Sequence, residues 1–222
     1  MNFSFRAVFW DMDGTLIDSE PLWSVATYEL SELLGRRITP EVREKTVGGS
    51  FRNTLNVLAT WAGIDPTTLD EHEYRQWMYR RMGELLTDLT PNPGVRELLT
   101  ALYPLPMLVT TNTERELADR CIDAVGREFF FSSITGDEVA HSKPAPDMYL
   151  EAARQVGAVP GECVVFEDSF AGMTAAHAAG CVVIGLAHET PEGVTSLAAL
   201  HGSLSLDGVT TDHVETWFKA LR

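Results

Sequence analysis

Polar residues close or follow four separate apolar runs of this 222-residue sequence. They are Asp11 and Asp13, then Thr110, Thr111 and Asn112, then Lys143, and finally Glu167, Asp168 and Ser169. If the runs are parallel strands, their carboxyl ends meet at one edge of a sheet, where open α/β proteins bind ligands. Each group alone has an ordinary structural explanation, as a turn or a helix cap. Four strand ends that carry this polar set together favour one functional site.

The chemistry that this set suits best is phosphoryl transfer. Several carboxylates at one edge repel each other and require a cation, and Mg²⁺ takes carboxylate, phosphate and water oxygens as ligands. Asp11 would be a nucleophile that forms an aspartyl-phosphate, with Mg²⁺ and Lys143 offsetting the charge of the approaching phosphate. Asp13 would protonate the leaving group and later deprotonate water. Thr111 would hold a phosphoryl oxygen.

Motifs of competing chemistries are missing from the sequence. It contains no GxxxxGK[ST] phosphate loop, no GxGxxG dinucleotide turn and no GxSxG nucleophile elbow. The six histidines show neither HxH nor HxxxH spacing, so a zinc site is not expected.

The elements that must position these residues alternate between two patterns. Short apolar runs, typical of buried parallel strands, occupy residues 7–10, 107–110, 129–134, 164–166 and 182–184, with a shorter run at 204–206. Helical patterns lie between most of them, at residues 114–125, 146–156 and 171–179, and one begins near Gly94. This alternation predicts an α/β fold with a Rossmann-like parallel sheet and helices on both faces.

One stretch breaks the alternation. From residue 21 to about 88 the apolar residues follow helical spacing, as in the stripe Leu22, Val25, Ala26, Leu30, Leu33 and Leu34. This helical stretch is too long to be a single crossover between the first and second strands. It therefore indicates an inserted helical domain. We therefore predict an α/β core of residues 1–17 and 90–222, and an all-helical cap domain of residues 18–89. Residues 16–20 and 90–93 would be the linkers.

Composition and charge restrict the partners and the cellular location that we expect for this protein. With 17 Lys and Arg against 32 Asp and Glu, the net charge is −15, which lacks the basic surface of a nucleic-acid binder and disfavours anionic membranes. No apolar run reaches the length of a membrane span, and no signal peptide is evident. The three cysteines are far apart, which predicts buried free thiols. We expect a monomeric cytoplasmic protein whose partner is a small phosphorylated metabolite.

The motifs resemble those of the haloacid dehalogenase-like hydrolase superfamily, over nearly the whole chain and in the family's order. They are Asp11-Met12-Asp13-Gly14-Thr15, Thr111-Asn112, Lys143-Pro144 and Glu167-Asp168-Ser169. The longer strings at residues 143–147 and 166–172, and the string at residues 18–23, are similar to the β-phosphoglucomutase-like branch.

The resemblance implies a role for each of these residues. Asp11 would be the nucleophile and Asp13 the acid/base. Mg²⁺ would be held by the Asp11 carboxylate, the Asp13 backbone carbonyl and Asp168, with Glu167 near the metal. The phosphoryl group would be bound by Thr111, Asn112 and Lys143, with Thr110 as the alternative to Thr111.

The branch also has a cap loop over the substrate, which residues 47–52 resemble. The substrate-contacting residues of the cap would be Trp23, Gly48, Ser50, Phe51 and Arg52. The mutases of the branch carry His at the position of Trp23, and Lys and Arg at those of Val47 and Phe51. A second phosphate needs such cations. Arg52 would either contact the substrate or be solvated.

The sequence thus favours a Mg²⁺-dependent phosphatase that hydrolyses a small phosphate monoester, with a sugar phosphate as the expected substrate. A phosphomutase of the same fold is the alternative. A non-catalytic binding module is a third hypothesis, against which the complete motif set argues.

Overall fold

The computed structural model describes residues 3–47, 51–86 and 89–222. The chain forms two compact units, which we describe separately. The first comprises Met1–Asp18 and Leu89–Arg222, and the second comprises Ser19–Asp88.

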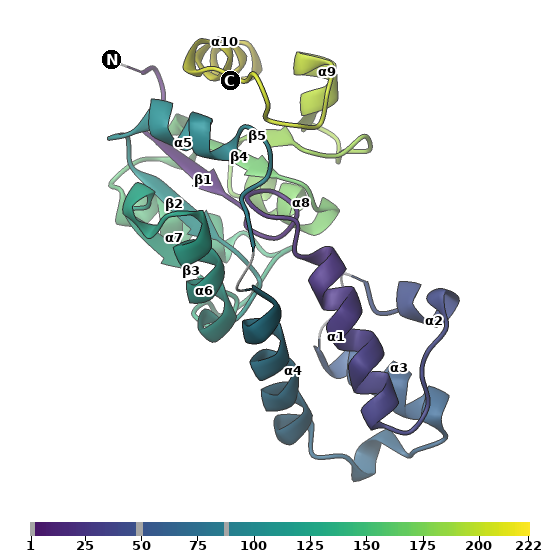
Figure 1. Ribbon diagram of the computed structural model, residues 1–222. Helices are drawn as coiled ribbons and strands as arrows, with labels where there is room; N and C mark the ends of the chain where they lie inside the picture. The colour runs from purple at the N-terminus through teal and green to yellow at the C-terminus, as the bar shows by residue number, and fades with distance from the viewer. Residues whose placement is uncertain (1–2, 48–50, 87–88) are drawn as a thin grey trace. The chain divides into compact units, whose positions relative to one another are not determined.

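The first unit is built on a six-stranded parallel sheet with the strand order β3-β2-β1-β4-β5-β6. The strands are β1 (Ala7–Trp10), β2 (Met107–Thr110), β3 (Ser132–Ile134), β4 (Cys163–Glu167), β5 (Val182–Gly185) and β6 (Thr195–Ser196). Figure 1 shows β1 in the middle of this sheet, where Trp10 pairs with Val109 of β2 and Phe166 of β4. Because both faces of a central parallel strand are covered, all four residues of β1 are apolar and buried.

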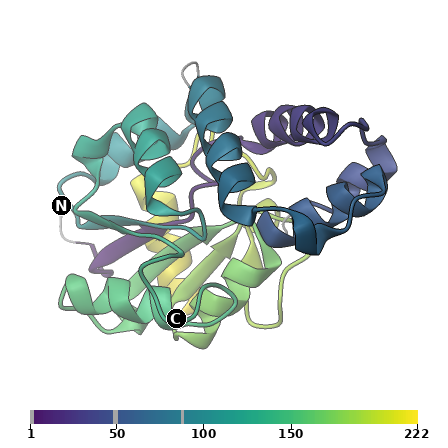
Figure 2. The ribbon, with the colours of Figure 1, turned by 90° about the horizontal axis from the view of Figure 1, so that it is seen from below.

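Helices cover both faces of the sheet, as Figure 2 shows. They are α5 (Val95–Leu102), α6 (Arg115–Val125), α7 (Asp147–Gln155), α8 (Phe170–Ala178), α9 (Leu197–His201) and α10 (Thr211–Leu221), with 3₁₀ turns η3 (Arg127–Phe129) and η4 (Pro160–Glu162). Right-handed crossovers put α5 and α6 on one face, and α7 and α8 on the other. The predicted α/β fold with a parallel sheet is confirmed.

The core of the first unit lies on both faces of the sheet. On one face, Phe9 of β1 and Val165 of β4 belong to a buried cluster with Met148, Tyr149 and Met173 from α7 and α8. Trp10 and Phe166 stack with ring centroids 4.6 Å apart. The strands are thus fixed side by side at the point where the polar groups follow them.

Within residues 19–47 and 51–86, the second unit consists of helices joined by turns and loops, with no strand. Its helices are α1 (Glu20–Leu33), α2 (Pro40–Glu44), α3 (Phe51–Ala62) and α4 (Glu71–Leu85), with a 3₁₀ turn η1 (Pro66–Thr68). Of the predicted stripe, Ala26 and Leu30 are fully buried, but Leu33 is 55% exposed and Val25 is 41% exposed. Arg81 of α4 also donates to both carboxylate oxygens of Glu29 in α1.

The strand predicted at residues 204–206 is wrong. This segment forms bends and turns between α9 and α10, and the edge position of the sheet belongs to β6. The hydroxyls of Ser203 and Ser205 accept hydrogen bonds from the backbone N–H groups two residues onward, which competes with strand pairing. The run at 129–134 is also shorter as a strand, because it begins inside η3.

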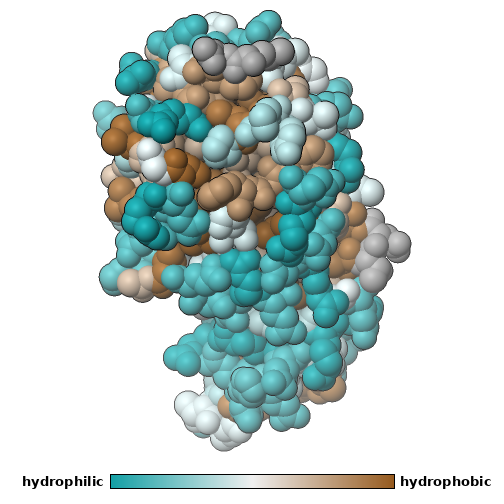
Figure 3. All heavy atoms as spheres, turned by 90° about the vertical axis from the view of Figure 1, so that its left-hand side faces the viewer, coloured by the Kyte–Doolittle hydropathy of each residue, from teal (hydrophilic) through white to brown (hydrophobic). Residues whose placement is uncertain are grey.

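Figure 3 shows one face of the molecule, where apolar side chains gather in the upper part of the view and hydrophilic ones in the lower part. Cys121, Cys163 and Cys181 are buried free thiols. Within the described residues, no helix combines the length and the apolar character that a membrane span requires.

Candidate active site

The carboxyl ends of the central strands bring the predicted polar residues of the first unit together. Asp11 follows β1, Thr111 follows β2, and Asp168 follows β4. The hydrogen-bond ladder between β1 and β4 continues to Asp11, whose N–H donates to the Phe166 carbonyl at 3.0 Å. These polar side chains are thus held by adjacent, fully buried strands.

Lys143 lies at the centre of this group. Its Nζ donates to Asp11 Oδ1 at 2.6 Å, to Glu167 Oε2 at 2.6 Å and to the Thr110 carbonyl at 2.9 Å. Burial alone would lower the pKa of Lys143, but the adjacent carboxylates of Asp11 and Glu167 raise it well above its usual value. The lysine is therefore a fixed positive charge beside the predicted nucleophile.

Glu167 is fully buried and its two carboxylate oxygens are both engaged. Oε2 accepts from Lys143 and, at 2.8 Å, from the hydroxyl of Tyr149 in α7. Oε1 accepts from the backbone N–H and the hydroxyl of Ser169 at 3.1 and 2.8 Å. Gly172 makes room for this carboxylate, since a Cβ there would lie 1.9 Å from Oε2. The tyrosine contact was not predicted from the sequence.

The remaining carboxylate oxygens fit a metal ion. One ligand atom each from Asp11, Glu167 and Asp168 lie within 4.8 Å of one another. Asp11 Oδ2 and Asp168 Oδ1 are buried without a hydrogen-bond partner. A buried carboxylate oxygen is costly unless a cation or a donor compensates it. This donor set of hard oxygens is the kind that Mg²⁺ prefers.

The pKa values in this cluster reflect the same shortage of positive charge. Burial, followed by the charge of Glu167, raises the pKa of Asp168 to about 6. The same two causes raise the pKa of Asp11 well above its usual value, against the opposing effect of Lys143. A bound cation would reverse these shifts by stabilising the charged forms.

A glycine permits the close approach of Asp168. Gly14 has a positive φ of 89°, and a Cβ at this position would lie 2.0 Å from Asp168 Oδ2. The glycine of the motif at residues 11–15 is therefore required both by its backbone conformation and by the adjacent carboxylate.

Threonines contact the predicted acid/base. Asp13 Oδ2 accepts from the hydroxyl of Thr113 at 2.7 Å and from that of Thr111 at 3.3 Å. The hydroxyl of Thr110 instead donates to the Trp10 carbonyl at 3.3 Å, inside the sheet. This geometry supports Thr111 over Thr110 as the threonine that faces the site.

Asn112 is exposed and contacts the backbone of Lys143. Its Oδ1 accepts from the Lys143 N–H at 3.0 Å, and its Nδ2 donates to the Lys143 carbonyl at 3.2 Å. The asparagine thus ties the loop of Lys143 to the end of β2. Its predicted contact with phosphate stays a prediction.

The predicted substrate-contacting residues of the cap lie in the second unit. Trp23 is half-buried in α1, and Phe51 begins α3. The Arg52 side chain is 74% exposed, and its Nε donates to Glu71 at 2.7 Å. Gly48 and Ser50 lie outside the described residues.

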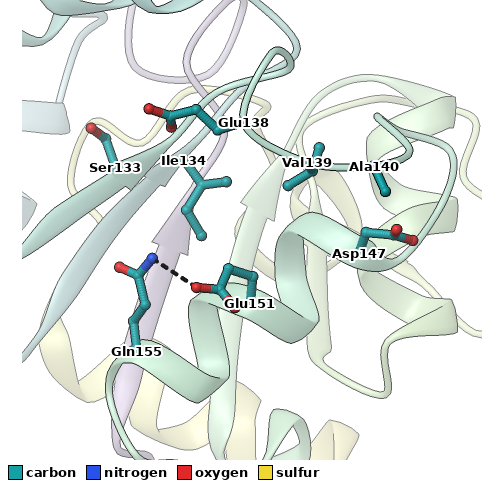
Figure 4. Close-up of a pocket in the computed structure, with 8 residues that line it drawn as sticks. All are labelled: Ser133, Ile134, Glu138, Val139, Ala140, Asp147, Glu151 and Gln155. Carbon is teal, nitrogen blue, oxygen red and sulfur yellow. Dashed lines mark hydrogen bonds between the residues drawn. The ribbon is translucent and has the colours of Figure 1, made fainter.

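A separate pocket of about 540 Å³ lies along β3 and α7 (Figure 4). Its lining residues are Ser133, Ile134, Glu138, Val139, Ala140, Asp147, Glu151 and Gln155, and none of them belongs to the carboxylate cluster. Within it, Gln155 donates to Glu151 at 3.1 Å. The chemistry-bearing residues thus lie elsewhere.

Comparison with known proteins gives consistent similarities. The model of a hydrolase family, haloacid dehalogenase-like hydrolase, matches residues 5–180. A phosphorylated carbohydrates phosphatase of Thermotoga maritima is 32% identical over 199 residues, which cover 87% of this chain and 91% of that protein. A fructose-1-phosphate phosphatase of Escherichia coli is 30% identical over 178 residues, which cover 79% of this chain and 93% of that protein.

The fold is also similar to solved structures. The crystal structure of CbbY from Rhodobacter sphaeroides in complex with phosphate has a TM-score of 0.80 and 25% sequence identity, and the match covers 95% of this chain and 99% of that one. The similarities therefore extend over both units of the chain.

Proposed function

Because the chain belongs to the haloacid dehalogenase-like hydrolases, we propose that it is a Mg²⁺-dependent phosphatase that hydrolyses a small sugar phosphate through an aspartyl-phosphate. The observation that carries this proposal is the group formed by the buried Asp11 and Lys143 with the half-buried Asp168. It combines a nucleophile, a fixed positive charge and carboxylate oxygens that lack partners. The relatives named as phosphatases support the same reaction class.

The proposed reaction has two steps. In the first, an Asp11 oxygen forms a bond to phosphorus, the bond from phosphorus to the ester oxygen breaks, and Asp13 gives its proton to that oxygen. In the second, Asp13 takes a proton from water, whose oxygen bonds to phosphorus. The bond to Asp11 breaks, and inorganic phosphate leaves.

The other residues supply charge and orientation. Lys143, 2.6 Å from Asp11 Oδ1, offsets negative charge at the nucleophile as the phosphate approaches. Thr111 would donate its hydroxyl to a phosphoryl oxygen. When bound by Asp11 and Asp168, Mg²⁺ would further neutralise the phosphate and the carboxylates. The Asp13 carbonyl as a ligand, and Glu167 near the metal, stay parts of this proposal.

The relatives guide the choice of substrate. Their printed names specify phosphorylated carbohydrates and fructose 1-phosphate, so we propose a sugar monophosphate for this chain as well. That residues 18–89 act as a cap selecting the substrate, through Trp23, Phe51 or Arg52, stays a prediction.

A phosphate-release assay tests the proposal. Purified protein would be incubated with fructose 1-phosphate, glucose 1-phosphate, glucose 6-phosphate and p-nitrophenyl phosphate, in Mg²⁺ or in excess chelator. We expect release in Mg²⁺, none in chelator, and none from the folded variant Asp11→Asn, since an amide is a poor nucleophile.

A matched variant controls for the removal of a charge. Asp123→Asn removes an exposed carboxylate that pairs with Arg127, and it should retain wild-type rates. Inactivity of the wild-type protein on every ester would favour a binding module. Full activity of Asp11→Asn, or in chelator, would contradict the mechanism.

A further inference from the structure

We infer that Thr113 is a positioning residue for the acid/base Asp13, an inference that rests on the proposed function. The Thr113 hydroxyl donates to Asp13 Oδ2 at 2.7 Å, which is a normal length for a bond from a hydroxyl to a carboxylate. Thr113 is half-buried, and it follows the end of β2 by three residues. The sheet therefore holds both partners of this contact, from β1 and from β2.

The two threonines differ in what they can give to Asp13. The Thr111 hydroxyl lies 3.3 Å from Asp13 Oδ2, and its oxygen also accepts from the Thr113 N–H at 3.0 Å. A hydroxyl has one proton to donate. If Thr111 turns that proton to a phosphoryl oxygen, as proposed above, its contact with Asp13 is lost. The shorter bond from Thr113 then holds the carboxylate.

This bond sets the orientation of the carboxyl group that transfers the proton. Because Oδ2 accepts from Thr113, the hydrogen bond fixes how the Asp13 carboxyl group is turned about its own axis. Asp13 gives its proton to the leaving oxygen as the bond from that oxygen to phosphorus breaks, and later regains one from the attacking water. Without this bond, the carboxyl group would be held less firmly in the reactive orientation. Thr113 thus acts through Asp13 and need not touch the substrate.

The leaving group provides the test. The alkoxide of a sugar phosphate needs a proton from Asp13, whereas p-nitrophenolate leaves as a stable anion without one. Thr113→Val removes the hydroxyl and keeps the shape. We expect this variant to lower kcat/KM at least about tenfold for the sugar phosphate that the wild-type protein hydrolyses fastest, since acid catalysis contributes about 10²–10⁴-fold. It should change kcat/KM for p-nitrophenyl phosphate less than about threefold.

Three further variants sharpen this experiment. Thr113→Ser restores a hydroxyl and should recover most of the sugar phosphate activity. Thr113→Val placed on Asp13→Asn should cost nothing further, because the residue acts only through Asp13. Thr100→Val is the matched control, since the exposed Thr100 hydroxyl donates to the Arg96 carbonyl within α5.

Each outcome decides the inference. A selective loss on the sugar phosphate with rescue by serine supports it. An equal loss on both esters would show a merely structural role, and unchanged rates would show no role, so either result overturns it. If Thr113→Val does not fold, Thr113→Ser and Thr113→Ala are compared in the same way. A wild-type protein that hydrolyses neither ester overturns the proposed function itself, and this inference with it.

Discussion

Lys143 compensates only part of the negative charge around it. Its ammonium contacts Asp11 and Glu167, and Asp168 completes a cluster of three carboxylates. One ammonium against these three carboxylates leaves an excess of negative charge, to which Asp13 adds, and a divalent cation would offset it. The lysine and the proposed Mg²⁺ therefore have separate tasks, and excess metal should not replace the lysine.

Lys143→Ala tests this separation. We expect phosphate release to fall at least about a hundredfold even at saturating Mg²⁺, because charge stabilisation at the nucleophile is lost. The variant should also lose about 3–5 kcal/mol of stability, since two buried carboxylates lose their partner. Phosphate release and thermal unfolding measure the two effects. Lys219→Ala, which removes an exposed lysine paired with Glu215, is the control. If excess Mg²⁺ fully restored phosphate release in Lys143→Ala, the lysine and the metal would not have separate roles.

The raised pKa of Asp168 predicts how metal binding depends on pH. Mg²⁺ binds the ionised carboxylate, so protons compete with the metal once the pH falls below about 6, the pKa of Asp168 in the metal-free protein. Because the pKa of Asp11, the other proposed carboxylate ligand, is also raised, calorimetric titration should show a Mg²⁺ affinity that falls as the pH is lowered from 8 to 5. An affinity independent of pH between 5 and 8 would contradict the assignment of Asp168 as a ligand.

The sequence predicts some residues of the site better than others. The charged residues were identifiable because four strand ends carry them together, although each group alone also fits a turn or a helix cap. Tyr149 was not, since an aromatic residue in a helical pattern fits a packing role equally well, and its hydroxyl contact with Glu167 depends on the fold. Thr113 has a weak signal, being two residues beyond Thr111, but its contact with Asp13 spans 100 positions.

At the level of elements, the turn after β1 makes the site possible. Gly14 and Gly35 both have positive φ, at 89° and 93°. A Cβ on Gly14 would collide with Asp168, whereas a Cβ on Gly35 would meet nothing within 4 Å. Substitutions at both glycines would strain the backbone, but only a substitution at Gly14 would also disturb the site. Comparing the two therefore distinguishes these effects.

Substituting each glycine by alanine exploits this difference. Both Gly14→Ala and Gly35→Ala should lose about 1–2 kcal/mol of stability from the left-handed backbone. Only Gly14→Ala should also weaken Mg²⁺ binding, because its Cβ displaces the Asp168 carboxylate. Unfolding and calorimetric titration of both variants measure this. Equal Mg²⁺ affinities in the two variants would argue against Asp168 as a ligand.

The strands could be predicted from the sequence where they are buried on both faces of the sheet. Residues 7–10 and 107–110 match β1 and β2, because a strand covered on both faces must be apolar throughout. Residues 204–206 failed because two leucines around a serine also suit a bend, and β6 was missed because its two residues are polar. Short edge strands depend on their neighbours more than on their own sequence.

At the scale of the whole molecule, the net charge of −15 disfavours a second phosphate unless cations are supplied locally. In the second unit, Arg52 is paired with Glu71, whose other carboxylate oxygen accepts from Arg75. Arg52 is thus engaged within the second unit. That water accepts the phosphoryl group, in keeping with the printed names of the phosphatases among the relatives, stays a proposal.

A phosphorus NMR time course separates phosphatase from mutase. With β-glucose 1-phosphate and a trace of the bisphosphate, we expect inorganic phosphate to be the product and no glucose 6-phosphate to accumulate. Desolvating a second phosphate dianion without cationic partners costs several kcal/mol. Glucose 6-phosphate that forms faster than free phosphate would instead establish a mutase.

The proposed covalent intermediate gives the most direct test of the mechanism. Wild-type protein is mixed with its fastest substrate in Mg²⁺, quenched in acid within the first turnover, and analysed by mass spectrometry of the intact chain and its peptides. We predict one added phosphoryl group, located on Asp11, and none in Asp11→Asn. Rapid phosphate release by Asp11→Asn, or a phosphoryl group on another residue, would contradict the role of Asp11 as the nucleophile.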